Sequence, residues 1–225
     1  MAEEAAYSVV DARRSAATLS DEAFREAFSA CADILGACFV FHPTKERAVD
    51  AFALLRGIDV ALDWPFGEES RRVRAAACFG RSASEFPEAV AEEFVRLLRG
   101  AGFSPAPPWG SVYMDRDKVM YGRTWTMLRD WMRARGVRGL YGEHDPEDQF
   151  GRMLVLAGEL ARTRPDLLCE FLGDHLLCWS GRFLAAFRKA ARTETYRGLA
   201  LLCETTLDDV RELLAIEPAA RRMYR

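Results

Sequence analysis

Residues 165–187 read PDLLCEFLGDHLLCWSGRFLAAF, and the spacing of their side chains predicts one long helix. Proline is favoured at the first position of a helix, so Pro165 marks the start. Large side chains then recur every three or four residues, which places them on one helical face. The members of this face are Leu168, Leu172, His175, Trp179, Phe183 and Phe187. We expect His175, in such apolar company, to be a core histidine rather than a catalytic base.

The same periodicity extends over most of the chain. Helices are expected over residues 20–42, 44–56, 68–80, 87–100, 115–135, 145–162 and 195–215, besides the one from 165. Ser20 and Asp145 are expected caps, and Thr206 to Asp209 mark a further cap inside the last helix. In the helix over 115–135, the side chains expected to point inward are those of Val119, Met127, Leu128 and Trp131. Because no convincing strand, repeat or low-complexity segment occurs, we predict an all-α fold.

The length and composition fit a single globular, bundle-like domain of about ten helices spanning residues 1–225. Half of the 225 residues are hydrophobic, which suffices for a sizeable core. Residues 103–112 carry three prolines and form a restrained extended loop, where two halves of the domain would meet. We expect a monomer, and exchange of the halves between two copies would give a dimer as the alternative.

Several classes of protein are excluded by bulk properties. The net charge of −3 argues against a nucleic-acid partner. No apolar run approaches the length of about 18 residues that spans a membrane, so no integral membrane segment is expected. Arg13-Arg14 is followed by Ser20-Asp21-Glu22 rather than by an apolar region, so it is not an export signal and we expect a cytoplasmic protein. The six cysteines include no C-x-x-C pair, which indicates reduced thiols and no metal site.

Sequence patterns of catalysis and nucleotide binding are missing. G-x-S-x-G, G-x-x-x-x-G-K-[ST] and G-x-G-x-x-G do not occur, and the three histidines are far apart. We therefore predict a protein that is not an enzyme, with no catalytic residue, no cofactor and no metal. A helical hydrolase that uses His144 and its acidic neighbours is the alternative from another class.

Residues 145–148, Asp-Pro-Glu-Asp, place acids at the expected start of a helix. Carboxylates at this position stabilise a helix N-terminus by about 0.5–2 kcal/mol, which accounts for Asp145 and one further acid. The other interpretation is a docking site for arginine, whose guanidinium forms bidentate pairs with carboxylates.

Residues 107–113, Pro-Pro-Trp-Gly-Ser-Val-Tyr, place aromatic rings on a stiff loop. They either plug a seam in the core or form the wall of a groove. The prolines lower the entropic cost of holding the rings in place, which favours a binding surface as much as a plug.

Several runs in a fixed order resemble a known family. They are Leu35–Phe39 with Pro43, Pro107–Tyr113, Asp145–Asp148, His175–Leu177, Trp179–Phe183, Thr195–Arg197 and Met223–Arg225. The chain resembles the TorD/DmsD family of cytoplasmic redox-enzyme maturation chaperones, and within it the DmsD branch. This resemblance implies an all-helical fold without catalytic activity.

The resemblance also implies a function. Members bind the twin-arginine leader peptide of a molybdopterin oxidoreductase catalytic subunit of the DMSO reductase type, and delay Tat export until cofactor insertion and folding are complete. The implied partners are this leader and components of the Tat translocon. The alternative within the family is an assembly chaperone for a molybdoenzyme subunit that has no Tat leader, as in the nitrate reductase branch.

The residues that the resemblance implicates in leader binding are Trp109, Ser111, Tyr113, Asp145, Asp148 and Gln149, with Phe94, Leu97 and Leu98 on the preceding helix. Three positions depart from the family pattern. Gln149 replaces a histidine and can form hydrogen bonds but gains no charge. Leu98 replaces a phenylalanine, and Asp145 replaces a longer glutamate.

Overall fold

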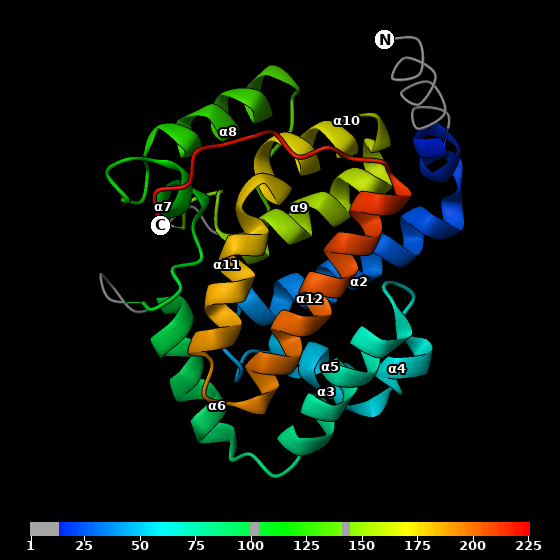
Figure 1. Ribbon diagram of the computed structural model, residues 1–225, viewed down its shortest axis with the longest axis vertical. Helices are drawn as coiled ribbons and strands as arrows, with labels where there is room; N and C mark the ends of the chain where they lie inside the picture. The colour runs from blue at the N-terminus through cyan, green and yellow to red at the C-terminus, as the bar shows by residue number, and fades with distance from the viewer. Residues whose placement is uncertain (1–13, 100–103, 141–144) are drawn as a thin grey trace.

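The computed structural model describes residues 14–99, 104–140 and 145–225, which form helices joined by turns and loops (Figure 1). In chain order the elements are α2 (Glu22–Val40), α3 (Glu46–Gly57), α4 (Val60–Asp63), α5 (Glu69–Ser82), α6 (Pro87–Phe94), the π-helical turn η1 (Val95–Arg99), α7 (Gly110–Met114), α8 (Arg123–Ala134), α9 (Phe150–Thr163), α10 (Pro165–Phe171), the π-helical turn η2 (Leu172–Leu176), α11 (Leu177–Ala190) and α12 (Glu194–Leu213). The described ranges contain no β-strand, and the predicted all-α class is confirmed. None of the described helices is both long and apolar enough to cross a bilayer.

Helix α9 lies at the centre of the molecule. Nearly every side chain from Phe150 to Ala161 is buried, with Glu159 as the exception, so the helix is covered on all sides. A helix that is buried all round needs neighbours on every face. Helix α2 covers one side of it, and α10, η2 and α11 pack nearby (Figure 1).

Glycines bring α2 and α9 into direct backbone contact. A Cβ atom at Gly36 would lie 2.5 Å from Val155 Cγ2 and 2.8 Å from the Gly151 carbonyl oxygen. A Cβ atom at Gly151 would lie 2.6 Å from Phe39 Cβ and 2.9 Å from the Gly36 carbonyl oxygen. Two helical turns further along α9, a Cβ atom at Gly158 would likewise be crowded by Ala32 of α2. No larger side chain fits at Gly36 or Gly151 unless the helices separate.

The predicted long helix from Pro165 is confirmed, with one modification. It runs without interruption to Ala190, but residues Leu172–Leu176 form a π-helical turn between α10 and α11. The six side chains expected on its inner face are all at most 8% exposed. Phe183 contacts Phe150 at a ring-centre distance of 4.8 Å, and Phe39 contacts Phe150 at 4.9 Å, so α2, α9 and α11 share one aromatic core. His175 is buried against Trp131 and Phe171, and burial lowers its pKa to about 4, as expected of a core histidine.

The expected cap at Thr206 to Asp209 is wrong, because these residues lie inside α12. Their polar groups hold the 64–67 turn instead. Thr206 Oγ1 accepts a hydrogen bond of 2.9 Å from Trp64 Nε1, and Asp209 Oδ2 accepts one of 2.7 Å from the Gly67 backbone N–H. The polar residues that suggested a cap thus fix a distant turn to α12.

Other element boundaries also differ from expectation. Asp21 rather than Ser20 caps α2, with its carboxylate accepting from the Ala23 N–H at 2.9 Å. Helix α8 begins at Arg123 instead of 115, because Asp115 binds the Thr124 N–H and the chain turns between them. Val119 and Met127, expected inside, are 53% and 38% exposed. Leu128 and Trp131 are buried as expected.

Replacing Gly151 by alanine should destabilise the fold by about 1–3 kcal/mol, because a methyl group forces α2 and α9 apart. The matched control is Gly181→Ala in α11, where a Cβ atom would meet nothing within 4 Å. That change should be neutral or stabilise by about 0.5–1 kcal/mol, since alanine favours a helix over glycine. Urea denaturation followed by circular dichroism measures both. Equal stability of the two variants would show that the fold does not depend on the close contact between α2 and α9.

Candidate functional site

The aromatic loop and the acidic turn lie side by side, although residues 114–144 separate them in the sequence. Two backbone hydrogen bonds join them, and together they make an antiparallel bridge between Trp109 and Gln149. The Gly110 N–H donates to the Asp148 carbonyl oxygen at 3.0 Å, and the Phe150 N–H donates to the Pro108 carbonyl oxygen at 2.7 Å. We call residues 108–114 and 145–152 the junction. Predicted site residues from both motifs therefore meet in one place.

Helix α9 begins at Phe150, five residues later than the sequence indicated, and Asp145 is not its cap. Gln149 is the cap residue: its Oε1 accepts from the Arg152 N–H at 2.8 Å. Its Nε2 donates to the Phe39 carbonyl oxygen in α2 at 3.1 Å. A single amide side chain thus both starts α9 and binds it to α2. A histidine at this position would have a different set of donors and acceptors.

Asp148 is buried, with 2% of its surface exposed, and it holds α7 in place. Its Oδ2 accepts from the Ser111 backbone N–H at 2.7 Å. Burial raises the pKa of this carboxyl to about 6, and the Ser111 hydrogen bond lowers it only in part. A carboxylate in this position is not available to a cation in solution.

The other acids of the turn are already paired with cations or donors. Asp145 Oδ2 lies 2.8 Å from Arg99 Nη1, and both side chains are half-exposed. Glu147 accepts a hydrogen bond of 2.6 Å from Trp125 Nε1. Glu147 also lies 3.4 Å from Arg129 Nε.

A third arginine, Arg152, sits beneath the turn. It is 7% exposed, donates to the Asp145 carbonyl oxygen, and has its pKa lowered by burial while Glu147, Asp145 and Asp148 act to raise it. Arg152 is not among the site residues expected from the sequence. No spacing rule indicates it, because Asp148 lies outside α9 and Arg152 binds the backbone of Asp145.

The aromatic loop packs onto α11. Tyr113 stacks on Trp179 with ring centres 5.6 Å apart, and Gly110 lies so close to Trp179 that a Cβ atom would be 3.0 Å from the indole. Tyr113 and Ser111 are buried, whereas Trp109 is half-buried and packs against the edge of the core. The loop therefore fills a seam and also presents one ring at its edge, which combines the two alternatives raised by the sequence.

Phe94, Leu97 and Leu98 do not lie on a surface in this structure. They are at most 2% exposed, and Val95 and Arg96 occupy the outer side of the same helix. Their spacing of three and four residues places all three side chains on the buried face of the helix. They position the loop indirectly, since the Ser104 hydroxyl, just before the prolines, donates to the Leu97 carbonyl oxygen at 2.6 Å.

The junction also collects buried polar atoms that make no hydrogen bond within the described ranges. They are Trp109 Nε1, Ser111 Oγ, Tyr113 Oη, Asp148 Oδ1 and Arg152 Nε. Buried polar side-chain atoms in native proteins are in the large majority paired. Their concentration on predicted site residues marks the junction as different from the rest of the core.

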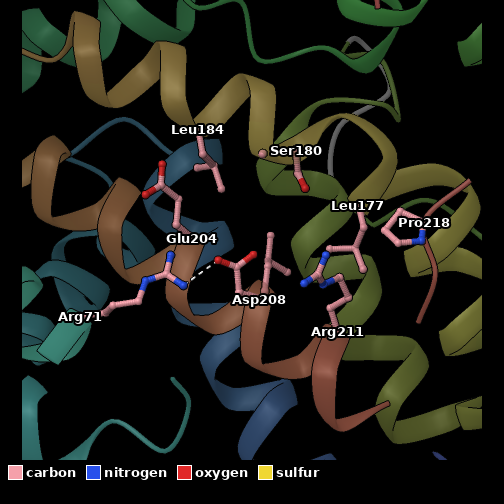
Figure 2. Close-up of a pocket in the computed structure, with 10 residues that line it drawn as sticks. Arg71, Leu177, Ser180, Leu184, Glu204, Asp208, Arg211 and Pro218 are labelled. Carbon is pink, nitrogen blue, oxygen red and sulfur yellow. Dashed lines mark hydrogen bonds and ion pairs between the residues drawn. The ribbon is translucent and has the colours of Figure 1, made fainter. Parts of the chain in front are cut away.

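The surface has two hollows, one away from the junction and one at its edge. One of about 310 Å³ lies between α11 and α12, and Figure 2 shows Arg71 reaching across it to Asp208, at 2.6 Å. None of the predicted site residues lines it. Another of about 450 Å³ adjoins Glu147 and is lined by Arg129, Arg133 and Arg138, a set that disfavours a cationic ligand. His144, on which the hydrolase alternative depends, lies outside the described residues.

Among the described residues, no three histidine, cysteine or acidic side chains gather as metal ligands. The fold and the junction define an all-helical protein in which an aromatic loop and an acidic turn are locked together at the start of a central helix.

Comparisons with known proteins give this class a family. A family model described as nitrate reductase delta subunit matches residues 61–185. The Tat proofreading chaperone DmsD of Salmonella typhimurium strain LT2 is 34% identical over 202 residues, covering 89% of this chain and 97% of that protein. The probable Tat proofreading chaperone DmsD of Haemophilus influenzae is 31% identical over 192 residues, covering 85% and 94%. The chain belongs to the TorD/DmsD family of nitrate reductase delta-type proteins, and the resemblance seen in its sequence is confirmed.

The buried carboxyl of Asp148 predicts a pH dependence of stability. Its pKa in the folded protein, about 6, lies above the ordinary value of 3.8, so the folded state holds the proton more tightly. Asp148 therefore contributes stability below pH 3.8 that is lost as the pH rises to about 6. The Asp148→Asn variant keeps an acceptor for the Ser111 N–H and serves as the reference. Relative to it, the free energy of unfolding of the parent chain should fall by about 1–3 kcal/mol as the pH rises through this range.

Urea denaturation at a series of pH values measures this difference. Asp130→Asn, which alters an exposed acid in α8, is the control and should show no such trend. A difference between parent and Asp148→Asn that does not change with pH would contradict a raised pKa.

Proposed function

We propose that this chain is a chaperone that binds the twin-arginine leader peptide of a molybdopterin oxidoreductase catalytic subunit. By holding the leader it delays Tat export until the enzyme has received its cofactor and folded. The observation that carries this proposal is the 34% identity to a Tat proofreading chaperone over 97% of that protein's length. A match over nearly the whole relative means that the loop, the turn and the core are all included.

The junction is our proposed leader-binding site, and Asp145 is its accessible carboxylate. The Arg99–Asp145 pair is half-exposed, and exposed ion pairs contribute only about 0–1 kcal/mol. An arginine of the leader can therefore exchange with Arg99 at little cost. The Arg99 side chain would then keep its second hydrogen bond, from Nη2 to the Val40 carbonyl oxygen at 3.0 Å.

The remaining site residues fall into two roles. Trp109, half-buried at the edge of the loop, supplies apolar surface for the segment that follows the arginine pair. Ser111, Tyr113, Asp148 and Gln149, with Phe94, Leu97 and Leu98, are buried, so we assign them to positioning the loop and the turn. Binding energy from a few well-placed anchors on such a rigid frame is typical of peptide recognition.

The family description favours a second candidate. A chaperone of the nitrate reductase delta type would act on a molybdoenzyme subunit without a Tat leader. It would recognise an N-terminal segment or a surface of the client that contains no arginine pair. The two candidates therefore differ in what the arginines contribute to affinity.

Calorimetric titration should separate them. We expect the purified protein to bind the leader peptide of the molybdopterin oxidoreductase encoded beside its gene with micromolar or tighter affinity. A copy of the peptide with Lys-Lys in place of Arg-Arg should bind more weakly, because lysine cannot form the bidentate pair with a carboxylate. No binding to either peptide, together with binding to a leaderless nitrate reductase-type subunit, would favour the second candidate.

Two substitutions with opposite expected effects test the role of Asp145. Asp145→Asn should weaken leader binding by about two- to fivefold, the range of an exposed ion pair. Arg99→Ala should tighten it, because the carboxylate no longer has an internal partner. The matched control is Asp166→Asn, which breaks a similarly exposed pair with Arg164 on α10 and should leave affinity unchanged. Loss of affinity in both the Asp145 and Asp166 variants would indicate a general charge effect instead of a site.

A further inference from the structure

Residues 216–225 follow α12 and cross the molecule to reach the aromatic loop. They have no regular secondary structure. In Figure 1 this red segment runs from the end of α12 past α10 to α7, beside the label C. Its sequence, IEPAARRMYR, contains an arginine pair, Arg221-Arg222, followed by two apolar residues. The segment thus has the composition of the proposed ligand and lies against the proposed site.

Backbone carbonyl groups hold this segment along its path. The Ala219 N–H donates to the Gly173 carbonyl oxygen at 3.0 Å, and the Tyr224 N–H donates to the Tyr113 carbonyl oxygen at 2.8 Å. Gly173 lies in the π-helical turn η2, where regular α-helical pairing is interrupted. Tyr113 is in the last turn of α7, whose carbonyl groups lack helical donors. Because no helical donor uses these two carbonyl groups, they can accept from the backbone of any extended chain, whatever its side chains.

The end of the segment is bound at the proline-rich loop. Arg225 Nη2 donates to the Ser104 and Pro105 carbonyl oxygens at 3.1 and 3.2 Å, and the Arg225 carbonyl oxygen accepts from Arg182 Nε at 3.0 Å. Met223 is half-buried against the core. A guanidinium, an apolar side chain and a backbone N–H are therefore all accommodated beside α7.

The arginine pair itself lies at the surface of the protein. Arg221 and Arg222 are exposed, and the Arg222 guanidinium lies 5.1 Å from the centre of the Tyr224 ring within the same segment. The Arg221 side chain also lies beside the Cys178 thiol of α11, which is a weak acceptor compared with a carboxylate. A ligand whose arginines reach a carboxylate would have an advantage over it.

We propose that residues 216–225 occupy part of the leader-binding surface and are displaced when a twin-arginine leader binds. This inference rests on the proposed function and extends it, because it assigns a backbone track to the ligand: the carbonyl groups of Gly173, Tyr113, Ser104 and Pro105. The leader binds there as an extended peptide. The Tyr113 carbonyl is the point at which the segment and the leader compete.

Competition of this kind lowers the apparent affinity for the leader. Only molecules in which residues 216–225 are undocked can bind the leader. The apparent dissociation constant for the leader therefore equals the intrinsic one divided by the undocked fraction. A substitution that weakens docking of the segment should therefore tighten leader binding, without adding any contact to the leader.

The test uses the full chain with Tyr224→Pro, which removes the N–H that binds the Tyr113 carbonyl oxygen. We expect leader binding, measured by calorimetry, to tighten by about three- to tenfold, the effect of losing one backbone hydrogen bond from the docked state. Arg225→Ala should act in the same direction. Ala220→Pro, a change at an exposed position between the two backbone hydrogen bonds, is the control and should have a smaller effect. Circular dichroism verifies that each variant is folded.

Hydrogen exchange gives a second, independent readout. In the parent chain, addition of leader should speed exchange in residues 217–225, because the Tyr224 N–H loses its acceptor.

The possible outcomes separate the two proposals. Equal or weaker binding by Tyr224→Pro, with unchanged exchange in the parent, would overturn the inference and leave leader binding intact. Absence of leader binding in the parent and in every variant would overturn the proposed function, and this inference with it.

Discussion

The contact between α2 and α9 at Gly36 and Gly151 is the constraint on which the junction depends. Because the two backbones touch, the start of α9 can occupy only one position relative to α2. Gln149, two residues before Gly151, is thereby brought within reach of the Phe39 carbonyl oxygen and caps the helix. Asp148 then points at α7 and holds the Ser111 N–H. A close approach of two glycines in the core in this way fixes the position of the aromatic loop.

The electrostatics of the acidic turn are those of a neutralised cluster. Three acids in the described part of the turn face three arginines, Arg99, Arg129 and Arg152, that come from different elements. A cation in solution therefore meets little free negative charge. Any arginine that binds here has to replace an internal one, and affinity depends on the difference between two ion pairs rather than on the strength of one. Because the difference between two such ion pairs is small, apolar contacts and backbone hydrogen bonds determine most of the total affinity.

The fold class and the position of most helices could be predicted from the sequence, because apolar side chains at helical spacing identify a buried face whatever it packs against. The inner face from Leu168 to Phe187 shows this. Boundaries were harder. Asp145-Pro146-Glu147 has every local property of a helix start, yet tertiary contacts move the start to Phe150, since Asp148 is used to hold Ser111 and Gln149 is used to hold Phe39. Val119 was misassigned because the turn before Arg123 depends on Asp115, whose role no spacing rule indicates. The pairing of the aromatic loop with the acidic turn, and the burial of Asp148, follow from contacts between distant segments that a single sequence does not record.

The position of residues 216–225 bears on how a leader would be released. A segment tethered to its own site has an effective concentration of about millimolar, so it competes at a constant level that does not depend on how much client is present. On the proposed function, a chaperone has to let go of its leader once the enzyme is folded. A tethered competitor favours this, because it reoccupies the Tyr113 carbonyl as soon as the leader lifts from it and opposes rebinding. The exposed arginines of the segment keep it weak enough to be displaced in turn. The affinity for the leader and its release then both depend on residues 216–225. Selection for a client would therefore act on how strongly this segment docks as much as on the acids of the turn.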